Sequence, residues 1–161
     1  MTDVYLGLGS NVGDSKAFID TAIDLLANHL KEIKRAPLYQ SKAVGYTEQP
    51  DFLNTAIRGQ THLTPQALLA VIHGIETDMG RTKTFRWGPR EIDIDIIFYG
   101  NTILDAPGLT IPHDSFRDRA FVLKPLADLD PGLIDPFSKL SMEVILKALP
   151  PEDIAAVQLL T

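Results

Sequence analysis

Two aspartates, Asp93 and Asp95, alternate with isoleucines in the stretch Ile92-Asp-Ile-Asp-Ile96. Strict alternation predicts a β-strand with one buried face, so both carboxylates project from the other face, about 7 Å apart at roughly 3.3 Å per residue. Two like charges at about 7 Å repel by about 2.4 kcal/mol at an effective dielectric constant near 20. Magnesium would remove that repulsion, because it binds one or two carboxylates and completes its shell with water and substrate phosphates. The pair therefore predicts a metal–phosphate site, although a bare Asp-x-Asp is also typical of a half-exposed acidic strand.

A basic segment comes directly before this strand. Arg81, Lys83, Arg86 and Arg90 lie within ten residues, in a chain whose formal net charge is −6. Guanidinium groups match pairs of phosphate oxygens. Trp87, the only tryptophan, lies in a glycine- and proline-containing turn, where its ring could stack on a base. The segment predicts an anionic ligand such as a nucleotide, and a solvated surface loop is the alternative.

Two weaker groups of residues complete the candidate site. His113 follows a proline and precedes two arginines, Arg117 and Arg119. These neighbours favour phosphate contact, although a lone histidine is more often structural. Phe52 and Asn54 offer a ring for stacking and an amide for a polar heterocycle, unless they merely begin a strand.

The elements that must position these residues follow from periodicity and capping. Asp14 or Ser15 can cap a first helix, and Thr64 before Pro65 begins a second. Pro37 indicates an edge position or a bulge in its strand. The expected strands are residues 4–8, 33–40, 52–59 and 92–99, with later helices over 121–129 and 142–149 and a last strand over 156–160. The order β-α-β-β-α-β predicts an α+β protein with a ferredoxin-like (split βαβ) antiparallel sheet packed with helices.

Composition limits the classes of function. A chain of 161 residues favours one domain spanning residues 1–161. It contains no cysteine, which excludes disulfides, thiolate metal sites and a cysteine nucleophile. The amino terminus lacks a signal-peptide pattern and no apolar run reaches about 18 residues, so we expect a cytoplasmic protein without a membrane span. The acidic net charge argues against nucleic acid and anionic membranes as partners.

The chain resembles the 6-hydroxymethyl-7,8-dihydropterin pyrophosphokinases of folate biosynthesis. The combination of Arg86-Trp-Gly-Pro-Arg90 with the aspartate pair is the most specific part of this resemblance. The other matching stretches are Gly9-Ser-Asn11, Gln49-Pro-Asp-Phe-Leu-Asn54, Gly80-Arg81, Ile111-Pro-His113 and Arg119-Ala-Phe-Val-Leu-Lys-Pro-Leu126. Together they run in family order from near residue 4 to about residue 136.

The resemblance implies transfer of pyrophosphate from ATP to the hydroxymethyl group of the reduced pterin, with AMP leaving. It implies a monomer that uses two Mg²⁺ ions held by Asp93 and Asp95. The implied catalytic positions are Arg81, Arg90 and Asp95. The implied ATP-binding positions are Glu76, Arg81, Lys83, Arg86, Trp87, Arg90, Ile96, Thr110, His113 and Arg119. The implied pterin-binding positions are Ala43, Val44, Gly45, Phe52, Asn54 and Phe121.

Two other functions remain open at this point. A nucleotidyl- or glycosyltransferase would use Asp-x-Asp to hold a metal-bound nucleotide. A non-catalytic ferredoxin-like module would bind a small ligand without magnesium and without turnover.

Overall fold

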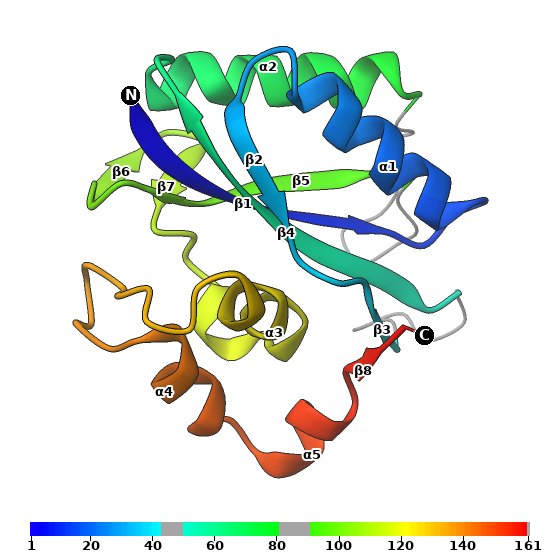
Figure 1. Cartoon of the computed structure of the whole chain (residues 1–161), viewed down its shortest axis with the longest axis vertical. Coiled ribbons are helices and arrows are strands. Elements are labelled where there is room, and N and C mark those ends of the chain that lie inside the picture. The colour runs from blue at the N-terminus through cyan, green and yellow to red at the C-terminus, as the bar shows by residue number, and fades with distance from the viewer. Residues whose placement is uncertain (43–49, 81–90, 161) are drawn as a thin grey trace.

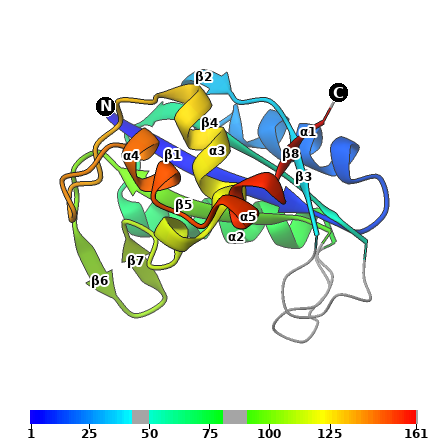
Figure 2. The same cartoon turned by 90° about the horizontal axis from the view of Figure 1, so that it is seen from below.

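The computed structural model of the chain describes residues 1–42, 50–80 and 91–160. Within these residues the chain forms a six-stranded sheet with helices on both faces (Figure 1). The helices are α1 (Ser15–Leu26), α2 (Pro65–Asp78), the 3-10 turn η1 (Phe116–Asp118), α3 (Ala120–Leu129), α4 (Met142–Lys147) and α5 (Pro151–Ala155). Helices α1 and α2 lie on one face of the sheet, and α3, α4 and α5 lie on the other (Figures 1 and 2).

The sheet has the topology expected from the sequence. Its strands are β1 (Thr2–Ser10), β2 (Lys31–Arg35), β3 (Tyr39–Ser41), β4 (Phe52–Thr61), β5 (Asp93–Tyr99) and β8 (Gln158–Leu159). They run antiparallel in the order β5-β1-β4-β3-β8, and β2 also pairs with β4. β4 lies between β1 on one side and both β2 and β3 on the other. The arrangement is therefore a split βαβ, and the predicted α+β ferredoxin-like fold is confirmed. A separate hairpin of β6 (Leu104–Ala106) and β7 (Leu109–Ile111) was not predicted.

Helix starts follow the predicted capping. The Asp14 carboxylate accepts a hydrogen bond from the Ala17 N–H at 3.1 Å, and α1 begins at the next residue. The Thr64 hydroxyl accepts from the Ala67 N–H at 3.1 Å, with Pro65 in the first turn of α2. Both side chains satisfy amide groups that have no partner within the helix.

One predicted strand was wrong in its extent. Residues 33–40 do not form one strand, since the chain pairs with β4 twice, as β2 and as β3, on either side of Pro37. Proline has no N–H to give to a sheet ladder. The Thr55 hydroxyl lies across the interruption and donates to the Ala36 carbonyl at 2.9 Å. The break therefore leaves β3 as a short separate strand.

Two hydrophobic cores follow from the alternation along β1. Val4, Leu6 and Leu8 face α1 and α2, and the first cluster forms around them. Tyr5 faces the other way, toward α3, and packs edge-on against Phe98 with ring centres 6.1 Å apart. The second core ends within β1, because positions 7 and 9 are glycines. The α3 side of the sheet is therefore left without core side chains at this end.

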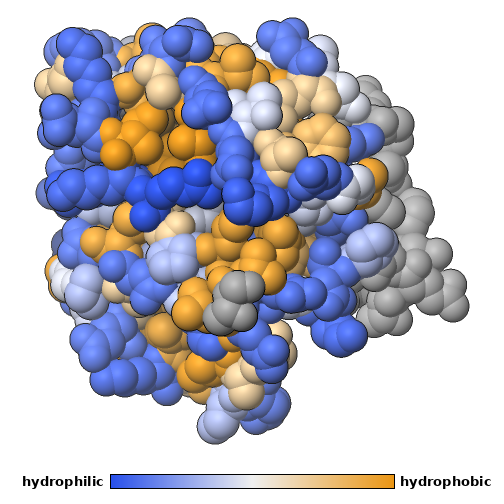
Figure 3. Space-filling view, turned by 45° about the vertical axis from the view of Figure 1, so that its right-hand side comes forward, coloured by the Kyte–Doolittle hydropathy of each residue, from blue (hydrophilic) through white to orange (hydrophobic). Residues whose placement is uncertain are grey.

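The surface is mixed in character. No helix within the described ranges has both the length and the apolar character needed to cross a membrane. On the face shown in Figure 3, apolar patches are separated by hydrophilic side chains.

Candidate active site

A cavity of about 830 Å³ lies over the part of the sheet that the second core leaves uncovered. Its floor is the end of β1, where Gly9 pairs with Asp93 on one side and Asn54 on the other, and Gly7 pairs with Asp95. Directly paired residues project from the same face of a sheet. Since the two glycines have no side chains, the backbone of β1 lies between the carboxylates of β5 and Asn54 of β4, whose amide nitrogen packs over Gly9.

The aspartate pair has the predicted arrangement. Asp93 and Asp95 are half-buried and line the cavity, while Ile94 and Ile96 are each 4% exposed and belong to the first core. The alternation along this strand is therefore confirmed. It places two carboxylates in the lining of the cavity, at the end formed by β5.

A buried glutamate fixes the backbone of this strand. Glu76 is 4% exposed, and its carboxylate accepts a hydrogen bond from the Ile94 N–H at 3.1 Å. Glu76 and Ile96 lie outside the cavity lining, and Thr110 is exposed on the small hairpin. A nucleotide contact by any of these three residues stays a prediction.

His113 is held beside the aspartates by an irregularity in β5. The β1–β5 register shifts near Ile97, and the Ile97 carbonyl accepts a hydrogen bond from the His113 N–H at 3.0 Å. This contact leaves His113 Nε2 at 3.9 Å from an Asp95 carboxylate oxygen. Because His113 Nδ1 accepts from the Ser115 N–H at 3.2 Å, a neutral ring carries its proton on Nε2, facing Asp95.

The charge of this histidine is set mainly by its surroundings. Burial lowers the pKa of His113, and the positive charge of Arg119 lowers it further. The carboxylates of Asp114 and Asp93 act in the opposite direction, and the net pKa lies below the usual histidine value. The ring is therefore uncharged at neutral pH and offers a hydrogen-bond donor.

The other end of the cavity is aromatic and polar. Phe52 from β4 and Phe121 from α3 both line it, together with Asn54. The side-chain oxygen of Asn54 is buried and has no hydrogen-bond partner among the described residues. Leaving such a group unpaired costs about 1–3 kcal/mol. An aromatic heterocycle with a polar edge would pair with that amide and stack on the rings.

Arg119 lies between the two ends of the cavity. Its guanidinium group is 5.7 Å from the ring centre of Phe121, and both residues line the cavity. Arg119 directly precedes Ala120, the first residue of α3. Asp118, one residue earlier, also lines the cavity. A positive charge at this position suits a phosphate that joins the two ends.

The donor set suits magnesium held mainly by its substrate. The described residues contain no group of three or more His, Asp or Glu side chains arranged to hold a metal ion. Two accessible carboxylates beside an open cavity, Asp93 and Asp95, are what Mg²⁺ needs when water and phosphates supply its other ligands. The residues present therefore fit the predicted metal.

Several predicted site residues cannot be placed, and others were missed. The positions outside the described residues are Ala43, Val44, Gly45, Arg81, Lys83, Arg86, Trp87 and Arg90. The cavity is also lined by residues that the sequence reading did not assign to the site, among them Gly7, Ser115, Asp118, Asp153, Ala156 and Val157. The glycines left a signal, since Gly7 and Gly9 occupy alternate positions within a strand, and glycine there often marks close approach of a ligand.

The chain is similar to enzymes of one family. The family model described as 7,8-dihydro-6-hydroxymethylpterin-pyrophosphokinase (HPPK) matches residues 5–131. The chain is 43% identical over 136 residues to 2-amino-4-hydroxy-6-hydroxymethyldihydropteridine pyrophosphokinase of Aquifex aeolicus (strain VF5), covering 84% of this chain and 85% of that protein. It is 40% identical over 155 residues to the folic acid synthesis protein fol1 of Pneumocystis carinii. That alignment covers 96% of this chain but 21% of the longer protein.

A solved structure supports the fold. The crystal structure of Plasmodium falciparum HPPK-DHPS, wild type with pterin and p-hydroxybenzoate, aligns with a TM-score of 0.73 at 16% sequence identity. The alignment covers 91% of this chain and 41% of that one. At 16% sequence identity, this comparison supports a shared fold and nothing further.

Proposed function

The chain belongs to the 7,8-dihydro-6-hydroxymethylpterin-pyrophosphokinase family, and on that premise we propose how its cavity carries out the reaction. The chain is a pyrophosphokinase of folate biosynthesis. In the proposed reaction, the hydroxyl oxygen of the pterin forms a bond to the β-phosphorus of ATP. The bond between that phosphorus and the oxygen bridging to the α-phosphate breaks, its electron pair leaves with AMP, and the hydroxyl releases its proton.

The observation that carries this proposal is the separation of two chemistries within one cavity. Carboxylates on β5 lie at one end, and the rings of Phe52 and Phe121 with the unpaired side-chain oxygen of Asn54 lie at the other. The β1 backbone at Gly7 and Gly9 lies between the two strands that carry Asp93 and Asn54. A heterocycle at one end and a triphosphate at the other would bring the hydroxymethyl group and the β-phosphate together over this part of β1.

Each end has a distinct role in the proposal. Phe52 and Phe121 stack on the pterin, and Asn54 pairs with its polar edge. Asp93 and Asp95 hold Mg²⁺, which when bound neutralises charge on the phosphates. Arg119 contacts the phosphates. Phosphoryl-type transfer depends mainly on positioning and charge stabilisation, so this division needs no covalent intermediate on the protein.

The neutral His113 ring supplements the phosphate end. Its Nε2–H lies on the Asp95 side and is able to donate to a phosphate oxygen without adding a charge near the metal ligands. We assign it an orienting role for the nucleotide.

The test is AMP formation from ATP and 6-hydroxymethyl-7,8-dihydropterin, with and without magnesium. ATP labelled at the β-phosphate should give labelled pterin diphosphate and unlabelled AMP, and the reaction should stop when EDTA removes the metal. A nucleotidyltransferase would instead release labelled pyrophosphate. Pterin binding without any turnover would favour a non-catalytic module, and either result would overturn the proposal.

We also propose that one chain is sufficient for activity. The described residues of one chain supply both the carboxylates and the aromatic rings of the cavity. Specific activity should therefore be independent of protein concentration. A fall in specific activity on dilution, matched by dissociation in analytical ultracentrifugation, would contradict this.

A further inference from the structure

The C-terminal segment, residues 150–160, forms a wall of the proposed substrate cavity. Asp153, Ala156 and Val157 line the same cavity as Phe121. The family model ends at residue 131, so this wall comes from a part of the chain that the model does not match.

The sheet register assigns the segment to one end of the cavity. β8 pairs with β3 at the edge opposite β5, and Tyr39 pairs with Leu159 on one side and with Asn54 on the other. The same row continues through Gly9 to Asp93. Four strand spacings of about 4.8 Å place β8 roughly 19 Å from β5. The segment thus lies near the amide end and far from the aspartates.

The backbone alone holds this segment weakly. β8 contains two residues, and the Leu160 N–H donates to the Leu38 carbonyl at 2.9 Å just beyond it. Both residues of β8 are exposed, as is most of α5. Val157 is the exception, since it is 4% exposed. A contact at Val157 would therefore decide whether the wall stays in place.

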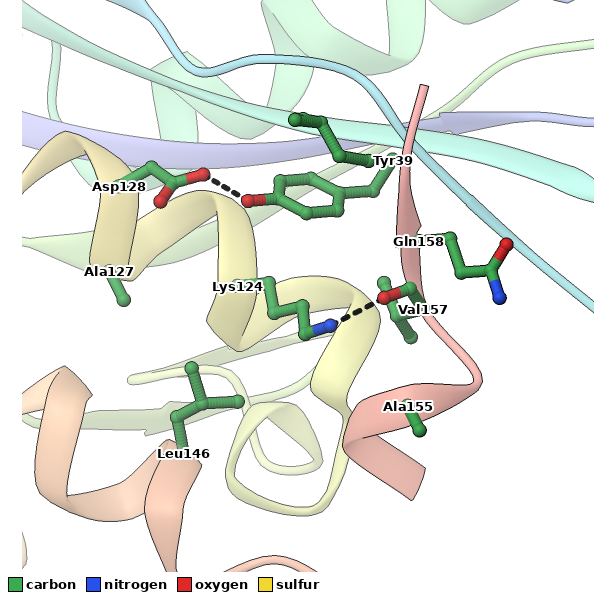
Figure 4. Close-up of a pocket in the computed structure, with 9 residues that line it drawn as sticks. Tyr39, Lys124, Ala127, Asp128, Leu146, Ala155, Val157 and Gln158 are labelled. Atoms are coloured by element: carbon green, nitrogen blue, oxygen red, sulfur yellow. Dashed lines mark hydrogen bonds between the residues drawn. The ribbon is translucent and has the colours of Figure 1, made fainter. Parts of the chain in front are cut away.

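Side chains of α3 supply that contact. The Lys124 ammonium group donates to the Val157 carbonyl and lies 5.9 Å from the centre of the Tyr39 ring (Figure 4). One helical turn later, Asp128 accepts a hydrogen bond from the Tyr39 hydroxyl. Lys124 also lies one turn after Phe121, the predicted stacking residue. The same face of α3 thus fixes β3, the C-terminal segment and one wall of the cavity.

Val157 lines two cavities. It lines the substrate cavity, and it also lines a second cavity of about 480 Å³ together with Tyr39 and Lys124 (Figure 4). Because a second cavity adjoins Val157, this part of the segment has room to move away from the substrate cavity unless a contact holds it. Among the described residues, Lys124 supplies a charged contact to Val157 through its carbonyl.

We propose that Lys124 is a positioning residue for the pterin end of the cavity. By holding the Val157 carbonyl it keeps the C-terminal segment against the site where the pterin ring binds. This inference rests on the proposed function. It predicts that loss of the ammonium group weakens binding of the pterin without affecting binding of the nucleotide, because the segment lies far from the aspartates.

The test uses the full chain with the substitution Lys124→Met, which keeps the aliphatic stem and removes the donor. The KM for the pterin should rise about tenfold, equivalent to about 1.4 kcal/mol, while the KM for ATP and kcat change by less than about twofold. Lys124→Arg retains a charged donor and should restore most of the pterin affinity. Lys147→Met removes the same charge from an exposed ion pair with Glu143 on α4 and should change neither KM.

A second measurement does not depend on catalysis. Amide hydrogen exchange over residues 157–160 should be faster in Lys124→Met than in the wild type, without substrates present. Faster exchange with an unchanged KM for the pterin would overturn the positioning role, and so would an equal rise in both KM values. If the wild-type chain forms no AMP, it is the proposed function that fails. The dissociation constant for the pterin alone then decides the inference, and an unchanged value in Lys124→Met would overturn it.

Discussion

The two ends of the cavity are built in different ways. The acidic end comes from one strand, where Asp93 and Asp95 lie two residues apart and share a face because of the alternation around them. The aromatic end is assembled from β4, α3 and the C-terminal segment, so that Asn54, Phe121 and Val157 meet from distant parts of the chain. One end therefore depends on local structure and the other on tertiary packing.

The difference predicts how each end responds to substitution. Substitutions at the acidic end should lower the rate of turnover and leave the fold intact, since the side chains there are half exposed. Changes at the aromatic end should alter shape and affinity, because each wall there is fixed by contacts with another element.

The largest effect is expected from Asp95→Asn. Losing one carboxylate from the metal end should lower kcat by about 1000-fold, the upper range for removing one electrostatic stabiliser of a transition state. Far-UV circular dichroism and the unfolding midpoint should stay near the wild-type values, because exposed polar residues contribute little to stability.

Asp105→Asn is the matched control for that variant, since Asp105 is an exposed carboxylate on β6, outside the cavity. It should keep full activity. Near-normal turnover in Asp95→Asn, measured beside this control, would refute the metal assignment.

The next effect concerns the turn that leads into α3. The Asp135 side chain is 0% exposed and accepts hydrogen bonds from Arg117 Nε at 2.6 Å and Nη2 at 3.0 Å. Arg117 also lies over the Phe116 ring, 4.6 Å from its centre. Breaking a buried ion pair costs about 3–5 kcal/mol, so Asp135→Asn should lower the free energy of unfolding by about 3 kcal/mol in urea titrations at pH 7.

The same pair gives the stability a pH dependence. Burial alone would raise the pKa of Asp135, but hydrogen bonds from Arg117, Ser138 and the Phe137 N–H hold it below the usual aspartate value. Because the pKa is lower in the folded state, this stabilisation is complete above the unfolded-state value of about 3.9 and is lost as the pH falls through the folded-state value. The stability difference between the wild type and Asp135→Asn should therefore shrink as the pH is lowered below about 4. A constant difference across that range would contradict the ionised pair.

A smaller effect tests the β1 backbone at Gly9. A Cβ atom added at Gly9 would lie 2.6 Å from the Asn54 amide nitrogen, closer than the two atoms can approach. Gly9→Ala should therefore displace the amide and raise the KM for the pterin about tenfold, the effect of losing about 1.4 kcal/mol. An unchanged pterin KM would mean that Asn54 does not contact the substrate.

The sequence predicted the parts that depend on local pattern. Alternation along β5 and side-chain capping at Asp14 and Thr64 each involve a few neighbouring residues, and each is confirmed. The order of elements then fixed the sheet. Strand 33–40 was wrong because the consequence of Pro37, two short pairings with β4, depends on where the partner strand lies.

The aromatic end was predicted less completely for the same reason. Val157 reaches the cavity because β8 pairs with β3 through two residues, about 120 positions apart in the chain, and no local pattern signals that pairing. Glu76 lies on an otherwise ordinary helix, and its burial depends on the Ile94 N–H of a later strand. Both contacts join residues that are distant in the sequence, so both are tertiary.

The smallest predicted effect lies far from both ends of the cavity. Gly74 is exposed within α2, and a Cβ atom added there would meet no heavy atom within 4 Å. Because glycine within a helix is about 1 kcal/mol less favourable than alanine, Gly74→Ala should raise the free energy of unfolding by up to that amount. Both KM values should stay unchanged, which makes this variant the control for adding a methyl group at Gly9. A change in either KM would mean that α2 is coupled to the cavity. The helix that carries Glu76 would then count among the elements that assemble the site.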